Sequence, residues 1–169
     1  MSELLDDLGK TLATQGGSHS HLVIAEIANT HEVIAIGLQG ARQEGFPLPP
    51  DLYQAIIEIA EKRALPITWM QASFSMIVPQ EKLPLDFFDD EQTTTHHGLS
   101  IHHLGRSGLK YLALFEAVHR ESAAALDQLK ALALSQMELL KVTRWVRTEG
   151  ILENQHGARL TEVLSALTQ

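Results

Sequence analysis

The stretch SGLKYLALFEAVHRESAAALDQLKALALSQMELLKVTRWVRT, residues 107–148, decides the fold that the sequence favours. It contains no proline, and its single glycine, Gly108, stands at its start. Apolar positions recur every seven residues, at Tyr111/Leu112, Val118/His119, Ala125/Leu126, Leu132/Ala133 and Leu139/Leu140. Such a repeat is typical of a helix that packs along a seam against other helices. The stretch therefore predicts one long helix over 107–148, which would measure about 60 Å.

A second apolar face lies off this seam and includes Leu114, Met137 and Val142. A helix with two apolar faces belongs in the middle of a bundle or across a dimer interface. We therefore predict that the long helix supplies an interface between copies or with a partner. Its expected residues are Tyr111, Phe115, Val118, Leu129, Leu132, Leu139, Arg144 and Trp145.

The rest of the chain also shows helical spacing of apolar residues. Helices are expected over 3–12, 22–41, 52–64 and 67–77, and a last short one contains Leu160 and Leu167. Over 22–38 a β-hairpin turning at Asn29-Thr30 is the alternative, because valine and isoleucine are abundant there. Pro79–Thr95 is expected to be an exposed loop. The fold class that follows is all-α, a bundle of five to seven helices around the long C-terminal helix.

The charge is distributed unevenly along the chain. The 169 residues carry a net charge of −8. Residues 1–100 hold five basic and fourteen acidic side chains, and residues 101–169 hold eight and seven. We divide the chain into an acidic region, 1–92, and a long-helix region, 93–169, within one compact domain. An acidic half suits a protein partner better than nucleic acid.

The amino-acid composition indicates the cellular compartment in which the protein is expected. Cysteine is absent, which excludes disulfides and fits a reducing cytoplasm. The first residues, MSELLDDLGKTLA, are acidic and amphipathic, unlike a signal peptide. The longest apolar run, Leu22–Ala28, contains Glu26 and is too short to span a bilayer. We expect a soluble, cytoplasmic protein without membrane contact.

Four histidines in TTTHHGLSIHHLGRS, residues 93–107, are candidates for metal ligands: His96, His97, His102 and His103. Neutral imidazoles bind metals well, but helical zinc sites pair histidines four residues apart, and no pair here has that spacing. The segment is better explained as a polar, pH-sensitive turn that enters the long helix. We therefore expect no metal and no cofactor.

Two further patterns resemble known sites. Glu116-x-x-His119 and Glu153-x-x-His156 repeat a spacing found in di-iron bundles, although such spacings also occur by chance. Residues 59–74 fit a helix-turn-helix, in which Thr68 and Gln71 would contact bases and Lys62 and Arg63 would lie near phosphates. The negative charge of this half disfavours that interpretation.

The sequence contains none of the common catalytic motifs: no GxSxG, no phosphate-binding glycine loop and no cysteine nucleophile. We expect a non-enzymatic adaptor or accessory subunit that acts through protein–protein contacts and self-associates or joins a larger complex. The alternatives are a dimeric DNA-binding regulator and, third, a histidine-ligated metal or haem protein.

Overall fold

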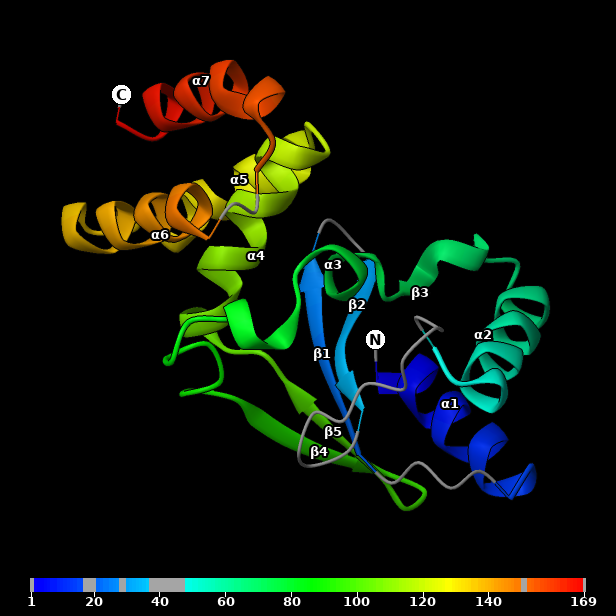
Figure 1. Ribbon diagram of the computed structural model, residues 1–169. Helices are drawn as coiled ribbons and strands as arrows, with labels where there is room; N and C mark the ends of the chain where they lie inside the picture. The colour runs from blue at the N-terminus through cyan, green and yellow to red at the C-terminus, as the bar shows by residue number, and fades with distance from the viewer. Residues whose placement is uncertain (1, 17–20, 28–29, 37–47, 150–151, 169) are drawn as a thin grey trace. The chain divides into compact units, whose positions relative to one another are not determined.

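The computed structural model is a mixed α/β fold, with seven α-helices and a five-stranded sheet among the residues that it describes (Figure 1). The structure describes residues 2–16, 21–27, 30–36, 48–149 and 152–168. The chain forms two compact units: Met1–Met76 with Glu91–Leu104, and Ile77–Asp90 with Gly105–Gln169. The all-α prediction is therefore wrong, because the first unit is built around a sheet.

Five strands form the sheet of the first unit, in the order β3-β2-β1-β5-β4. Strands β1 and β2 are antiparallel, as are β4 and β5, whereas β1–β5 and β2–β3 are parallel. The centre of the sheet is thus β1, and β3 and β4 are its edges. The strands are β1 (His21–Ile27), β2 (Thr30–Ile36), β3 (Met70–Gln71), β4 (Gln92–His96) and β5 (Leu99–His103).

The helix predicted over 22–41 is wrong, and the alternative hairpin is confirmed by the antiparallel pairing of β1 with β2. Ala28, Asn29 and residues 37–41 lie outside the described residues. Leu22 to Ala25 are all buried, so the apolar run in β1 is continuous. A strand buried on both faces lacks the alternation that identifies half-exposed strands, which is why its sequence also fitted a helical stripe.

Two helices cover one face of the sheet, here called the helix face. They are α1 (Ser2–Thr14) and α2 (Pro50–Arg63), and both were predicted. Proline stands in the first turn of α2, where its missing N–H costs nothing. Their apolar residues join those of the strands in one core, which includes Leu5, Leu8, Leu52, Ile56, Leu22, Ile24, Val33, Leu99 and Ile101.

The helix predicted over 67–77 is also wrong. The segment divides into a 3-10 turn (η1, Ile67–Trp69), the short strand β3 and helix α3 (Ser73–Ile77). The buried carboxylate of Glu32 in β2 accepts hydrogen bonds from the Ser73 hydroxyl and the Phe74 amide at the first turn of α3. This contact with a distant strand is not visible in a local window of sequence.

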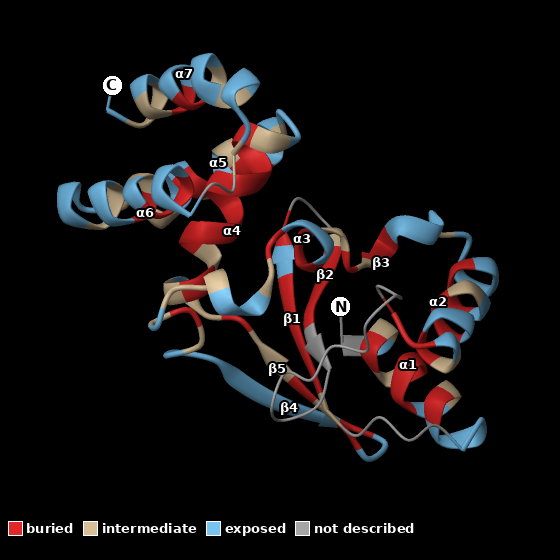
Figure 2. Cartoon of the chain, in the orientation of Figure 1, coloured by how far each residue is buried: buried red, intermediate tan, exposed pale blue. Residues whose placement is uncertain are grey.

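The second unit is helical and is organised around α4 (Arg106–His119), which packs against the three helices that follow. Buried residues run through most of α4 in Figure 2. The following helices are α5 (Ala123–Leu132), α6 (Gln136–Thr148) and α7 (Gly157–Leu167), with 3-10 turns η2 (Gln80–Lys82) and η3 (Asn154–His156). The helix predicted near Leu160 is confirmed as α7.

The single long helix over 107–148 is wrong, because the chain breaks twice within it. Glu121 and Ala133 adopt positive φ angles of 53° and 47°. After each break a serine caps the next helix: Ser122 accepts from the Ala125 amide, and Ser135 forms a capping box with Glu138. The local caps stabilise three shorter helices, and the seven-residue repeat describes the faces that pack between them. Among the described residues, no helix is long and apolar enough to cross a membrane.

Candidate functional site

The hairpin of β4 and β5 carries the four histidines singled out in the sequence. His97 and Gly98 connect the strands with positive φ angles of 51° and 88°. A two-residue turn with both residues at positive φ matches the twist of a hairpin, and glycine is favoured at its second position. The predicted loop over 79–95 therefore ends in a strand, and the segment 93–107, predicted to be a turn, contains most of a β-hairpin.

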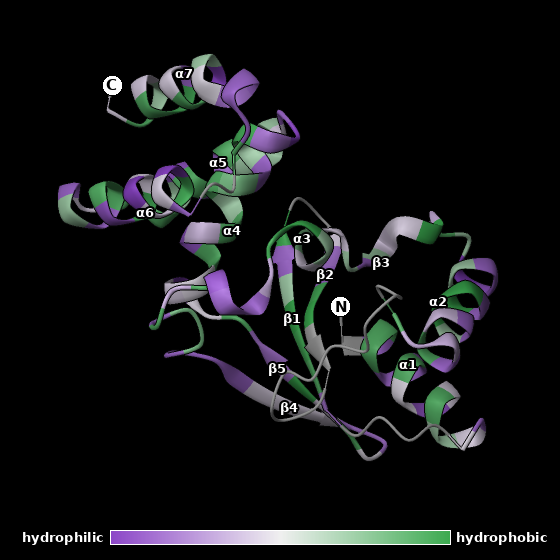
Figure 3. Cartoon of the chain, in the orientation of Figure 1, coloured by the Kyte–Doolittle hydropathy of each residue, from purple (hydrophilic) through white to green (hydrophobic). Residues whose placement is uncertain are grey.

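Strand β4 is an edge of the sheet whose surface is open. It pairs with β5 on one side, and the described residues place no strand on its other side. The side chains of residues 92–95 are all exposed, as Figure 2 shows for the strand. Figure 3 shows β4 in purple and white, whereas β1 is mostly green. The exposed side chains of this edge strand are therefore polar.

The backbone of this edge offers hydrogen-bonding groups. In an antiparallel pair, alternate residues direct their N–H and C=O toward the partner strand. The two-residue turn closes on the pair His96 and Leu99, so Thr94, paired with Ile101, also directs these groups toward β5. Thr93 and Thr95 then direct theirs away from the sheet.

Natural edge strands usually carry protection that β4 lacks. Lysine, proline, a bulge or very short length normally prevents pairing with another chain. The sequence of β4, QTTTH, has no lysine or proline, and its register with β5 is regular over all five pairs. The opposite edge, β3, has only two residues, and its Met70 is buried. The two edges therefore differ in their capacity to accept a strand.

A chain of polar contacts lies on the face of the hairpin opposite the helices. The Glu91 carboxylate lies 3.0 Å from Nδ1 of His102, and Nε2 of His102 lies 3.2 Å from Nδ1 of His21. The Thr93 hydroxyl is 3.1 Å from the same Nδ1 of His102. A carboxylate at Nδ1 favours the tautomer with its proton there, which leaves Nε2 to accept from His21.

The helix face holds a second group. His96 is buried and contacts the Asp6 carboxylate of α1, and its other ring nitrogen lies 2.9 Å from the Thr94 hydroxyl. That hydroxyl is 2.8 Å from Nε2 of His103. The hydrogen bond from His96 lowers the pKa of Asp6, and burial together with nearby His96 lowers the pKa of His103. These contacts anchor β4 to the first helix.

The four candidate metal ligands do not converge. Successive residues of a strand point to opposite faces, so His102 is separated from His96 and His103, while His97 lies in the turn. Within the described ranges, no three His, Asp or Glu side chains are grouped to hold a metal ion. The sequence indicated Glu91 as an acid near the histidines, but it did not identify Asp6 or His21 as neighbours, because contacts between distant segments carry no local signal.

The residues predicted for an interface on the long helix lie mostly inside the second unit. Arg144 is exposed, and Leu132 and Leu139 are partly buried. The others are buried: Tyr111, Phe115, Val118, Leu129 and Trp145. Buried side chains form the core of the unit and cannot meet a partner without unfolding it.

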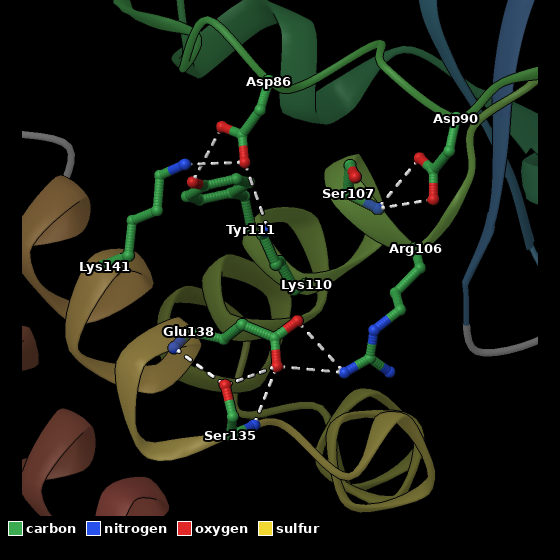
Figure 4. A network of polar contacts seen from close by, with 9 residues as sticks. All are labelled: Asp86, Asp90, Arg106, Ser107, Lys110, Tyr111, Ser135, Glu138 and Lys141. Atoms are coloured by element: carbon green, nitrogen blue, oxygen red, sulfur yellow. Dashed lines mark hydrogen bonds and ion pairs between the residues drawn. The ribbon is translucent and has the colours of Figure 1, made fainter.

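The most extensive polar network of the second unit fixes residues 77–90 to α4 and α6 (Figure 4). The Asp86 carboxylate accepts hydrogen bonds from Lys110 at 3.2 Å, Lys141 at 2.8 Å and the Tyr111 hydroxyl at 3.1 Å. Burial alone would raise the pKa of Asp86, but these three donors outweigh it and lower the pKa to about 2. Because all three donors are engaged by one carboxylate that joins residues 77–90 to two helices, the network is best explained as structural.

The same reasoning applies to the end of α4. Asp90 accepts from the Ser107 amide at 3.0 Å, and Arg106 forms a salt bridge with Glu138 at 3.1 Å. Both carboxylates lie at helix N-termini, Asp90 at that of α4 and Glu138 in the first turn of α6, where the helix dipole favours negative charge. Glu138 is thus engaged by Arg106 and Ser135.

The histidines of the two Glu-x-x-His patterns, His119 and His156, lie next to each other in the second unit. The rings of His119 and His156 lie 4.9 Å apart, and His119 stacks on Phe115. Burial, followed by the nearby His156, lowers the pKa of His119, and burial raises the pKa of Glu116. His119 packed against the buried Phe115 ring and the His156 imidazole fits a packing contact in which both histidines are partly buried.

The helix-turn-helix geometry is not formed. Arg63 binds Asp7 and Glu3 of α1, and Lys62 lies 3.6 Å from Asp7. Thr68 is in a 3-10 turn and Gln71 is in β3. The basic side chains are paired within the chain, and no recognition helix follows them.

Comparison with known proteins adds no further information. No protein-family model matches the sequence, and neither curated proteins nor solved structures give a similar chain.

Proposed function

We propose that the chain is a non-enzymatic interaction module that binds a protein partner by adding the partner's strand to the edge of β4. The observation that supports this is the open, regular edge of β4, whose residues 92–95 are exposed. Strand addition uses main-chain hydrogen bonds for affinity and side chains on alternate positions for specificity. The edge directs the N–H and C=O of Thr93 and Thr95 outward for such bonds.

Anchoring of β4 supports the same role. A strand that adds a partner must keep its shape, and β4 is held by β5 along its length and by the Asp6–His96 contact to α1. A rigid edge loses little conformational entropy when it binds. Neither DNA binding nor a metal centre has comparable support in the described residues.

The proposal is tested with a pair of variants at one position. Thr95→Pro removes an outward N–H while leaving the inward bonds of β4 in place, and proline is tolerated at such edge positions. Thr95→Val keeps the N–H and the β-branched shape. The full-length tagged chain is purified from cells of its own source, and the co-purified proteins are quantified by mass spectrometry.

We expect Thr95→Val to retain the partners of the wild type and Thr95→Pro to lose them. Copies of the untagged chain count among these partners. If both variants retain the same proteins, or the wild type retains none, the proposed function is wrong.

A further inference from the structure

We infer that the partner strand is β4 of a second copy of this chain, paired antiparallel about Thr94. This inference rests on the proposed function and specifies its partner. The result would be a two-fold dimer in which the two sheets join edge to edge. The inference depends on three features of β4: its outward groups, its threonines and the side chains at its two ends.

The register follows from the direction of the backbone groups. Two edge strands can pair only where outward N–H and C=O groups of one meet those of the other. Centring the pairing on Thr94 places Thr93 opposite the partner's Thr95, and both direct these groups outward. It also overlaps all of Gln92–His96, whereas centring on Thr93 or Thr95 shortens the overlap. The Thr94 pairing is therefore the longest register that satisfies the backbone.

The side chains suit this register. Thr94 meets its own copy at the two-fold axis, and each Thr93 meets a Thr95. Cross-strand threonine pairs are favourable because their methyl groups pack and their hydroxyls can bond. Threonine also has a high preference for strands. Three exposed threonines in a row on a strand without lysine therefore favour self-pairing over repulsion.

The ends of the strand are complementary in charge and hydrogen bonding. In the same register Glu91, which precedes β4, lies opposite His97 of the second copy. An imidazole carries an N–H in either protonation state and can donate it to a carboxylate. The contact occurs twice because of the symmetry. The acidic end of one strand thus meets the histidine end of the other.

The size of the contact sets its strength. A five-residue strand pair covers far less surface than a stable dimer interface, so the association should be weak and depend on concentration. Sedimentation velocity of the untagged full-length protein over a wide concentration range measures it directly. Circular dichroism and tryptophan emission check that each variant is folded.

The backbone test uses the same pair of variants as above. We expect Thr95→Val to dimerise like the wild type and Thr95→Pro to dimerise at least about tenfold more weakly. A second edge variant, Thr93→Lys with Thr95→Lys, keeps every N–H but places lysines opposite each other across the interface. It should also be monomeric, so the test does not depend on the proline alone.

The register test exchanges the charges at the ends. His97→Asp tolerates the left-handed backbone of the turn and places an acid opposite the partner's Glu91. We expect it to weaken the dimer by about twofold to thirtyfold, since it creates two exposed pairs of like charge. Adding Glu91→Lys should restore the wild-type association. His102→Gln is the control, because it removes the internal partner of Glu91, which is also that of the Thr93 hydroxyl, without replacing a residue of β4.

The outcomes separate this inference from the proposed function. A wild-type protein that stays monomeric, or a dimer that survives Thr95→Pro, overturns self-pairing. So does a dimer abolished by Leu140→Glu on the exposed face of α6 but not by the edge variants. If Thr95→Pro still loses other co-purified proteins, the proposed function stands with a different partner strand.

Discussion

Asp86 offers the sharpest test of how the second unit is held together. Its carboxylate is the common acceptor for Lys110, Lys141 and the Tyr111 hydroxyl. Asp86→Asn removes the charge but keeps a side chain of the same shape that can still accept hydrogen bonds. The change therefore removes the charge and replaces one of the two acceptor oxygens with an amide nitrogen, while the shape stays the same.

The magnitude follows from the pKa of Asp86, which falls from 3.8 to about 2 in the folded protein. Because the folded state holds the proton less tightly, the ionised carboxylate stabilises the fold by about 2 kcal/mol at neutral pH. Lys110, with a side chain 7% exposed, would then be left without its anion. An unpaired buried charge adds to the cost, so we expect Asp86→Asn to lower the free energy of unfolding by about 2–4 kcal/mol.

Urea unfolding at pH 7 measures this change. Trp145 lies in the second unit and donates a hydrogen bond to the Lys82 carbonyl, so its emission follows the unit directly. A Trp69→Phe background removes the other tryptophan. Asp89→Asn is the matched control, because Asp89 is exposed and should change the unfolding free energy by less than about 0.5 kcal/mol.

Acidification provides an independent check of the sign. The stabilisation by Asp86 is complete above its unfolded pKa of 3.8 and is lost as the pH falls through the folded value of about 2. The difference between wild type and Asp86→Asn should therefore shrink between pH 4 and pH 2. A variant as stable as the wild type at pH 7, or a difference unchanged at pH 2, would refute the reasoning.

Three further changes test other parts of the fold, each by urea unfolding followed by circular dichroism. Ser135→Ala removes the capping box of α6 and should cost about 1 kcal/mol. Gly9→Ala places a Cβ 2.1 Å from the His96 carbonyl oxygen, so α1 must shift away from β4, and it should cost more than about 1 kcal/mol although alanine favours helices. Burial and the nearby His156 lower the pKa of His119 below 6.5, so the unfolded state takes up the proton first and stability should fall below that pH. His119→Phe should reduce this acid dependence, and an unchanged pH profile would contradict the assignment.

The sequence predicted helices best where a single apolar face and clear terminal signals coincide. The helix near residues 52–64 begins after prolines and carries an acid in its first turn, and it was located correctly. The strands were harder to predict. In β1 both faces are buried, and in β4 residues 92–95 are all exposed, so neither strand shows the alternation of apolar and polar residues that identifies strands.

The breaks in the long helix had a local signal that the periodicity concealed. Ser135-Gln-Met-Glu138 is a capping box, which marks the start of a helix even in the middle of an apolar repeat. The repeat spans the breaks because α4, α5 and α6 all contribute to one core. The spacing of apolar residues indicates which residues are buried, whereas capping residues indicate where a helix begins. The capping residues therefore distinguish three helices from one long helix.

The candidate site shows where local reasoning ends. The stretch His96–Leu99 could have been identified as a hairpin turn from the glycine after a residue that tolerates positive φ, although histidine is a less typical first residue than asparagine. In a hairpin, successive side chains of each strand point to opposite faces. This alternation separates the histidines between the two faces of the sheet, so the basis for a metal site is lost. The open edge, in contrast, depends on the order of strands in the sheet. Strand β5 pairs in parallel with the side of β1 that does not pair with β2, so its hairpin partner β4 becomes the outermost strand. No property of the residues in β4 alone determines that position.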